Sequence, residues 1–240
     1  MLTRVLEPEV MDTAEEAVDY DSMDHSTVNR LFVDDLLAAA ERFGESEIAA
    51  SDVSTQRQQK SLRVLDVGTG TALIPIELCR RPIDATVWAI DLAVEMLKLA
   101  EFNVRTAGLD GRIVLEQSDG KSLDYDDGEF DWVISNSIVH HIPEPRDALA
   151  EMLRVLRPGG LLFVRDLARP QTNSDVEYLV ATYAGDANEN QQQLFRQSLH
   201  AALTVEEVRE LMREFDWPAD WVVMNSDRHW TIYGVKSGGI

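Results

Sequence analysis

The chain has 240 residues, of which 45% are hydrophobic, and this is enough for one sizeable domain with a packed core. It carries 43 acidic residues against 22 Lys and Arg, a formal net charge of -21, so nucleic acids and anionic membranes are not expected as partners. The single cysteine, Cys79, excludes an internal disulfide, and no N-terminal apolar run resembles a signal peptide, so a cytoplasmic protein is expected.

The N-terminal part of the chain predicts helical structure outside the main domain. Residues 1–24 are acidic with few large apolar groups, which indicates a loose arm with at most a short helix. Apolar side chains then recur at helical spacing over residues 26–43. Residues 44–61 are rich in Ser, Gln and Asp and predict a polar connection.

From residue 63 onward, strand patterns alternate with helix patterns. The expected strands are 63–68, 85–91, 112–119, 130–136 and 157–167, and the expected helices between them are 71–80, 94–106 and 145–156. Strands that alternate with crossover helices predict a parallel, doubly wound sheet of the α/β class.

The alternation breaks after the fifth strand. Two helices are expected at 174–184 and 190–202 with no strand between them, so residues 168–203 are predicted to form a helical insertion. A capping box at Thr204 then begins a further helix. The last two strands, at 220–225 and 229–236, are separated by so short a turn that they must be antiparallel neighbours.

The first strand ends in Asp66-Val67-Gly68-Thr69-Gly70, a turn that favours close approach of a nucleotide. A dinucleotide fingerprint would need glycine where Leu73 stands, and a Walker phosphate loop would need Gly-Lys-Ser/Thr. S-adenosylmethionine is the third possibility, since it is a nucleoside ligand without a pyrophosphate. It needs an acid before the glycines and another at the end of the second strand.

Acidic residues follow three successive strands. Asp66 ends the first strand, Asp91 ends the second, and Asp119 follows the third. Ligands bind at the carboxyl edge of such sheets, where all three acids are expected. Together with the glycine turn they favour S-adenosylmethionine as the cofactor.

These residues resemble those of the class I S-adenosylmethionine-dependent methyltransferases. The matching stretches, between Leu62 and Val164, are "VLDVGTGTA", "IDLAVEML", "SDG", "FDWVISNSIVHHIPEP" and "ALAEMLRVLRPGGLLFV". One departure is Ala72, where the family often has a third glycine. The resemblance implies a mostly parallel seven-stranded sheet that ends in an antiparallel hairpin. It also divides the chain into an N-terminal arm and helical lid (1–60) and a methyltransferase domain (61–240) with a helical insertion at 168–203.

The resemblance also implies a set of cofactor-binding residues. Gly68 and Gly70 would lie against the methionine and ribose of the cofactor, Asp91 would bind the ribose hydroxyls, and Asp119 would bind the adenine amino group. The full set is Asp66, Gly68, Thr69, Gly70, Asp91, Leu92, Met96, Ser118, Asp119, Gly120, Ser135 and Asn136.

Catalytic candidates follow the fourth strand. A general base is needed only when the acceptor arrives protonated, and His140 and His141, with Arg165 or Asp166 at the end of the fifth strand, are the candidates. The two histidines can also be structural members of the "HHIPEP" turn. No ligand spacing indicates a metal site. Residues expected in the lid or against the substrate are Tyr20, Met23, Asn29, Arg30, Arg165, Tyr178 and Tyr183.

The sequence therefore predicts a small-molecule methyltransferase that works by in-line displacement under a helical lid, as a monomer or homodimer. Two alternatives stay open: a regulatory protein that binds the cofactor without turnover, and a methyltransferase that acts on a protein partner. Neither nucleic acid nor membrane is an expected partner. The acceptor atom (O, N, C or S) is not specified by these residues.

Overall fold

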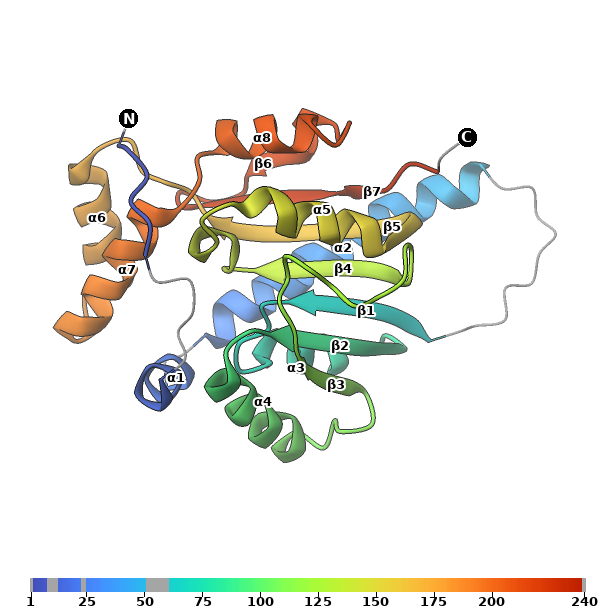
Figure 1. The fold of residues 1–240 in the computed structure, drawn as a ribbon, viewed down its shortest axis with the longest axis horizontal. Helices are drawn as coiled ribbons and strands as arrows, with labels where there is room; N and C mark the ends of the chain where they lie inside the picture. The colour runs from blue at the N-terminus through green and yellow to red at the C-terminus, as the bar shows by residue number, and fades with distance from the viewer. Residues whose placement is uncertain (1, 8–12, 23–24, 51–60, 239–240) are drawn as a thin grey trace.

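The computed structural model describes residues 2–7, 13–22, 25–50 and 61–238, and its centre is a seven-stranded sheet in the order β3-β2-β1-β4-β5-β7-β6 (Figure 1). The strands are β1 (Leu62–Val67), β2 (Ala85–Asp91), β3 (Ile113–Gln117), β4 (Phe130–Asn136), β5 (Leu156–Leu167), β6 (Val222–Met224) and β7 (His229–Val235). Strands β1 to β5 pair in parallel, and β7 runs antiparallel to both of its neighbours, β5 and β6. The predicted doubly wound sheet and terminal hairpin are confirmed.

Both faces of the sheet are covered by helices, because neighbouring strand residues point to opposite faces. Val64 packs with the helices α2 (Ser26–Ala50), α3 (Leu73–Cys79) and α4 (Val94–Thr106). Leu65, the next residue, packs with α5 (Pro145–Val155) and α8 (Val205–Arg213) on the other face. In Figure 1, α5 lies in front of the sheet and α2 behind it.

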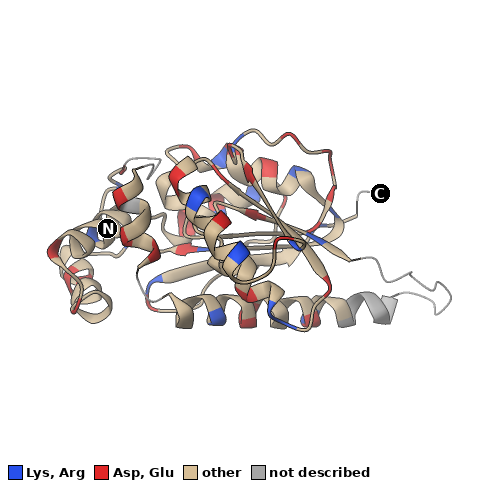
Figure 2. Cartoon of the chain, turned by 90° about the horizontal axis from the view of Figure 1, so that it is seen from below, with Lys and Arg blue, Asp and Glu red and all other residues tan. Residues whose placement is uncertain are grey.

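Helix α2 is longer and more deeply packed than the sequence indicates. Phe32, Val33 and Leu36 are fully buried, so the middle of α2 belongs to the core of the main domain. The helix continues to Ala50, seven residues beyond the expected end at Phe43. The predicted polar connection is therefore wrong over residues 44–50, whose Glu and Ala residues favour helix; residues 51–60 lie outside the described part. Figure 2 shows α2 as the long helix beneath the sheet, with acidic positions spread over the molecule.

The predicted insertion consists of α6 (Asn173–Tyr183) and α7 (Glu189–Ala201), each of which begins with a capping box. The N-terminal segment, residues 2–7, lies against α7, where the Val5 amide donates to the His200 carbonyl at 3.1 Å. Helix α1 (Ala14–Asp21) packs beside α4, and Asn103 Nδ2 donates to Asp21 Oδ1 at 2.9 Å. The N-terminal part of the chain and the insertion thus meet at one end of the sheet (Figure 1).

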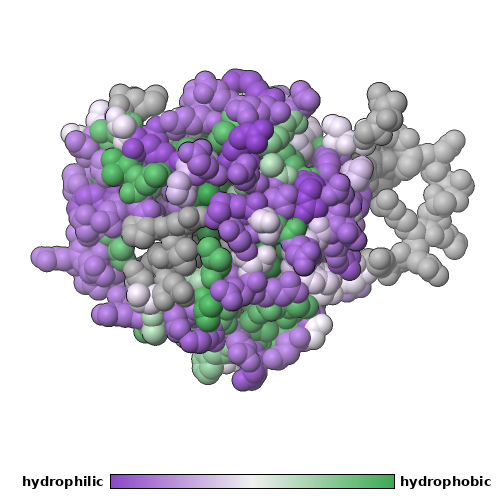
Figure 3. Space-filling model, in the orientation of Figure 1, coloured by the Kyte–Doolittle hydropathy of each residue, from purple (hydrophilic) through white to green (hydrophobic). Residues whose placement is uncertain are grey.

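The surface agrees with the composition. On the face shown in Figure 3 hydrophilic residues predominate, and hydrophobic residues occur in small groups. Among the described helices, none combines the length and the hydropathy that a membrane span requires.

Candidate cofactor and acceptor site

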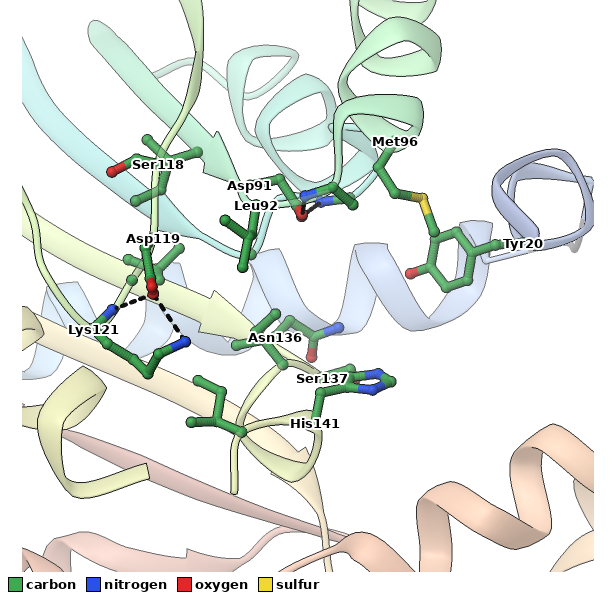
Figure 4. A pocket seen from close by; sticks show the side chains of 18 residues that line it. Tyr20, Asp91, Leu92, Met96, Ser118, Asp119, Lys121, Asn136, Ser137 and His141 are labelled. Carbon is green, nitrogen blue, oxygen red and sulfur yellow. Dashed lines mark hydrogen bonds and ion pairs between the residues drawn. The ribbon is translucent and has the colours of Figure 1, made fainter. Parts of the chain in front are cut away.

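A cavity of about 110 Å³ lies at the carboxyl edge of the sheet, where β1, β2, β3 and β4 end (Figure 4). Nine of the residues expected to bind the cofactor line it: Gly68, Gly70, Asp91, Leu92, Met96, Ser118, Asp119, Gly120 and Asn136. The lid candidate Tyr20 lines it as well. We call this cavity the donor pocket.

The glycine turn after β1 forms one wall of the donor pocket with its backbone. Gly68 has a φ of 74°, and a Cβ atom there would lie 2.7 Å from the side chain of Ile138. Gly70, with a φ of 55°, faces the ring of Tyr20. Ala72, the departure from the family pattern, is also left-handed, with a φ of 62°. Glycine adopts this conformation without steric cost, which explains the family preference at that position.

Asp91 joins the ends of two strands. Its Oδ2 accepts a hydrogen bond from the Gly70 amide at 2.7 Å, and its Oδ1 accepts one from the Ala93 amide at 2.9 Å. A carboxylate has about four lone-pair sites, which is more than these two amides occupy. Asp91 is 8% exposed and lies on the wall of the donor pocket, as the ribose-binding role requires.

Asp119 lies on a more open wall of the pocket, after β3. Its Oδ1 accepts from the Lys121 amide at 2.9 Å and lies 3.1 Å from Lys121 Nζ. Burial raises the pKa of this carboxyl, but the hydrogen bonds and the charge of Lys121 together lower it by more, so the net shift is downward. Lys121 also lines the pocket and was not expected from the sequence, although it directly follows the "SDG" stretch.

Asp66 and Thr69 line a second, smaller cavity of about 20 Å³ behind the glycine turn, next to Asn29 and Asn136. Burial, and then the charge of Asp91, raise the pKa of Asp66 to about 7. A cationic group bound here would favour the ionised form of Asp66. The cavity therefore suits the ammonium group of an amino acid moiety.

Ser135 and Asn136 end β4, but the structure places them differently. Asn136 lines both cavities. Ser135 is fully buried, and its hydroxyl donates to the Val67 carbonyl at 2.7 Å. Its side chain therefore ties β4 to β1 and does not form part of the pocket wall.

Helix α1 brings Tyr20 to the donor pocket. Its ring is stacked on His25 with centroids 4.6 Å apart and lies beside Met96 in Figure 4. Burial, followed by the charges of Asp91 and Asp66, raises the pKa of Tyr20 to about 12, so its hydroxyl stays protonated. Tyr20 therefore covers the pocket as a neutral, partly polar side chain.

The other lid candidates lie away from the donor pocket or outside the described residues. Met23 lies outside them, and Arg30 is exposed and bonds only Thr27 at 3.4 Å among the contacts described. Arg165 is buried, and its guanidinium donates to Asp35 at 2.6 Å and to Thr231 at 3.0 Å. It therefore ties α2 to the sheet.

Tyr178 and Tyr183 are exposed on α6. Tyr178 lines a separate cavity of about 380 Å³ between α6 and α8. The Tyr183 hydroxyl donates to Asp227 at 2.6 Å, and Arg228 lies 3.4 Å above its ring. In the described structure neither tyrosine lines the donor pocket.

The two catalytic candidates lie on the short helix η1 (Val139–His141). His141 lines the donor pocket, whereas His140 is buried behind it and is 4% exposed. His140 Nδ1 lies 2.5 Å from Asp166 Oδ1, and Asp166 Oδ2 accepts from the His140 amide at 3.0 Å. Burial lowers the pKa of His140, but Asp166 and then Glu7 raise it, so the net shift is upward. Burial raises the pKa of Asp166, but His140 lowers it, so its net shift is downward.

Glu7 joins this pair from the N-terminal segment. Its Oε1 lies 3.4 Å from His140 Nε2 and 3.2 Å from His141 Nδ1. Burial raises the pKa of Glu7. Arg4 fixes the segment in place by donating to the carbonyls of His140, Ile142, Pro143 and Ala201. No pattern in the sequence indicates that Glu7 reaches the histidines.

Residues 65–164 match the family model of a methyltransferase domain. This stretch of the chain is therefore similar to a methyltransferase domain. The chain is 36% identical over 146 residues to the methyltransferase GfsG of Streptomyces halstedii, which covers 60% of this chain and 50% of that protein. It is 39% identical over 108 residues to the demethylmenaquinone methyltransferase of Porphyromonas gingivalis, and this match covers 45% of this chain and 44% of that protein. The chain thus spans about half the length of these relatives.

The whole fold is also found among solved structures. A putative S-adenosylmethionine-dependent methyltransferase from Methanococcus maripaludis superposes with a TM-score of 0.66 at 16% identity, covering 100% of this chain and 99% of that one. The fold is therefore the class I fold of S-adenosylmethionine-dependent methyltransferases, and the predicted recognition is confirmed. S-adenosylmethionine is the methyl donor of this domain family.

Proposed function

We propose that the chain is an enzyme that transfers a methyl group from S-adenosylmethionine to a small molecule. The observation that carries this proposal is the position of Asp91, which lies on the pocket wall with both oxygens held by the Gly70 and Ala93 amides. This arrangement presents a fixed carboxylate where the ribose of the donor is expected. Asp66 and Asp119 flank it on the amino acid and adenine sides.

The residues of the site act by orientation and by excluding water. The donor supplies a methyl group on a sulfonium, which is already an activated leaving group. Gly68 lets the backbone approach the donor closely, Asp91 fixes its position, and Tyr20 covers the pocket from α1. Holding donor and acceptor in line accounts for a large part of the barrier reduction in such displacements.

A small acceptor is favoured by the surroundings of η1. The N-terminal segment and α7 pack beside η1, with the Arg4 bonds fixing them there. The relative from Porphyromonas gingivalis is described by its name as acting on demethylmenaquinone, which is a small molecule. A cytoplasmic location, and a monomeric or homodimeric state, stay predictions.

The lid prediction is refined by these contacts. We propose that α1, through Tyr20, and the N-terminal segment, through Glu7, close the pocket, with α6 and α7 behind them. The middle part of helix α2 is buried against the sheet, so it supports the sheet and does not serve as a lid.

Two measurements test this function. Titration calorimetry with S-adenosylhomocysteine should show binding, and Tyr20→Ala should weaken it by about tenfold, whereas Tyr20→Phe should bind like wild type. Incubation with methyl-labelled donor and a cell extract should place the label in the low-molecular-weight fraction, and Asp91→Ala should abolish the labelling.

Two outcomes would contradict the proposal. Label that is found only in protein would favour the macromolecular alternative. Tight binding of S-adenosylhomocysteine with no transfer to any fraction would favour a regulatory protein that binds the cofactor without turnover.

A further inference from the structure

Glu7, His140 and His141 bring three metal-binding side chains together at the edge of the donor pocket. One ligand atom from each lies within 4.8 Å of the others. The Glu7 Oε1 atom is buried and accepts no hydrogen bond, although the two ring nitrogens lie 3.2 and 3.4 Å away. A buried carboxylate oxygen without a donor is costly unless a cation satisfies it.

The separations suit a bound metal ion. Zinc binds imidazole nitrogen and carboxylate oxygen at roughly 2.0–2.2 Å in a tetrahedral arrangement, which places neighbouring ligand atoms roughly 3.3 Å apart. The distances from Glu7 Oε1 to His140 Nε2 and His141 Nδ1 are close to this value. Two histidines and one carboxylate leave one tetrahedral position open.

The surroundings orient two of the three ligand atoms. Asp166 Oδ1 lies 2.5 Å from His140 Nδ1, so Nε2 is the nitrogen that faces Glu7. A carboxylate behind a ligating imidazole is the usual support of a histidine ligand. On the other side, Ser198 Oγ donates to Glu7 Oε2 at 3.3 Å, which leaves Oε1 directed at the histidines.

The local charges also favour a divalent cation. Glu7 and Asp166 contribute two carboxylates in a buried place. Arg4 is a nearby cation whose charge acts on both carboxylates. Its hydrogen bonds among the described residues all go to backbone carbonyls, so it fixes the segment without a hydrogen bond to Glu7. A divalent ion would balance the two carboxylates.

We propose that Glu7, His140 and His141 bind a divalent transition metal ion, with Zn²⁺ as the ion best suited to this donor set, at the acceptor edge of the donor pocket. His141 belongs to both the cluster and the pocket wall, so the open position can take an oxygen from an acceptor in the pocket.

A role in catalysis rests on the proposed function. A hydroxyl group of the acceptor would bind at the open position, where the ion lowers its pKa and the proton is lost to solvent. The oxygen then forms a bond to the methyl carbon, and the carbon–sulfur bond breaks with its electron pair left on sulfur. Because the acceptor must carry a hydroxyl group that loses its proton, the acceptor class is an alcohol, phenol or enol.

Metal binding can be measured without donor, acceptor or turnover. Tag-free protein is treated with EDTA, dialysed and titrated with ZnCl₂ by calorimetry, and Co²⁺ is added separately to record its visible absorption. We expect one Zn²⁺ per chain and a Co²⁺ spectrum of low-coordinate geometry. If Glu7 and the two histidines share only a proton, the protein will bind neither Zn²⁺ nor Co²⁺.

Matched variants locate the site. Glu7→Gln and His141→Ala should weaken Zn²⁺ binding by roughly a hundredfold or more, and Asp166→Asn by about 10–100-fold. Glu15→Gln and His200→Gln change the same residue types outside the cluster and should bind like wild type. The affinity of each variant for S-adenosylhomocysteine shows that the domain is folded.

The results separate this proposal from the proposed function. No binding of Zn²⁺ or Co²⁺ to wild type, or equal binding by Glu7→Gln and His141→Ala, would overturn the metal site. Methyl transfer at full rate by EDTA-treated protein would overturn its catalytic role and leave the proposed function standing. Stoichiometric Zn²⁺ binding without any methyl transfer would support the metal site and overturn the proposed function.

Discussion

The two ends of the donor pocket are built in different ways. At the donor end, the glycine turn, Asp91 and Asp119 follow β1, β2 and β3, so each group lies at the end of a strand in chain order. At the acceptor end, which we define as the cluster behind the pocket-lining residue His141, Glu7 comes from the N-terminal segment and His140 from η1, while Asp166 comes from β5. The first end depends on backbone geometry and the second on contacts between distant segments.

This difference indicates which end can change without loss of the fold. A side chain at Gly68 would collide with Ile138, and Asp91 holds two backbone amides, so substitution there disturbs the sheet edge itself. Glu7 and His141 contribute to no strand pairing. Substitutions at the second end are therefore expected to leave the strand pairing of the sheet intact.

The largest expected effect is at the donor end, in Asp91→Ala. Charge-assisted hydrogen bonds from two ribose hydroxyls are worth about 1.5–3 kcal/mol each, so affinity for S-adenosylhomocysteine should fall by about a hundredfold or more. Calorimetry measures this, with Asp119→Ala as the control at the more exposed position, where we expect less than about tenfold. Equal losses in both variants would contradict the central place of Asp91.

At the acceptor end, Arg4→Ala should release the N-terminal segment. Its guanidinium donates to four carbonyls, and each bond from a charged group contributes about 1.5–3 kcal/mol when made. Hydrogen exchange at the Val5 amide should accelerate by about tenfold or more. Arg4→Lys should recover part of the protection, since lysine is a point charge without the fork geometry. Unchanged exchange would show that the segment is held by other contacts.

The pH dependence of stability gives a smaller, graded test of the donor end. The pKa of Asp66 is about 7 in the folded protein, against 3.8 for an unperturbed carboxyl, because the side chain is buried and lies near Asp91. Between these values the folded state holds a proton that the unfolded state has lost. The free energy of unfolding of wild type relative to Asp66→Asn should therefore fall as pH rises from about 4 to about 7, by at most about 1.4 kcal/mol per pH unit, and level off above.

Urea unfolding at several pH values measures this difference. Parallel pH profiles for the wild type and for Asp66→Asn would show that Asp66 does not titrate in this range.

The smallest effects are expected for Arg30→Ala and Tyr178→Ala. Arg30 is exposed and bonds Thr27 on its own helix, and Tyr178 is 66% exposed on α6. Unfolding free energies should change by less than about 0.5 kcal/mol, and cofactor affinity should stay the same. A loss of methyl transfer with normal cofactor binding would place these two side chains on the path of the acceptor, as the sequence suggested.

Much of the fold could be predicted because its signals are local. Helix α4 and strand β4 have the bounds that their hydrophobic patterns indicate. The end of α2 was missed because Gly44 lies within a helix that continues through good helix formers.

The donor end of the site could be predicted for the same reason, since each residue stands at a strand end. Ser135 and Arg165 also stand at strand ends, but the pattern does not show that their side chains turn toward Val67 and Asp35. Glu7 could not be found, because its partners come together only when α7 and η1 pack.

The attachment of residues 2–7 has a consequence for biosynthesis. These residues are synthesised well before their partners, the carbonyls of His140, His200 and Ala201. During translation, at about 5–20 residues per second, the segment must therefore remain unattached until the insertion has emerged. The acceptor end of the pocket is completed after the sheet strands β1 to β5 have been synthesised, so a nascent chain can acquire its donor end before its acceptor end.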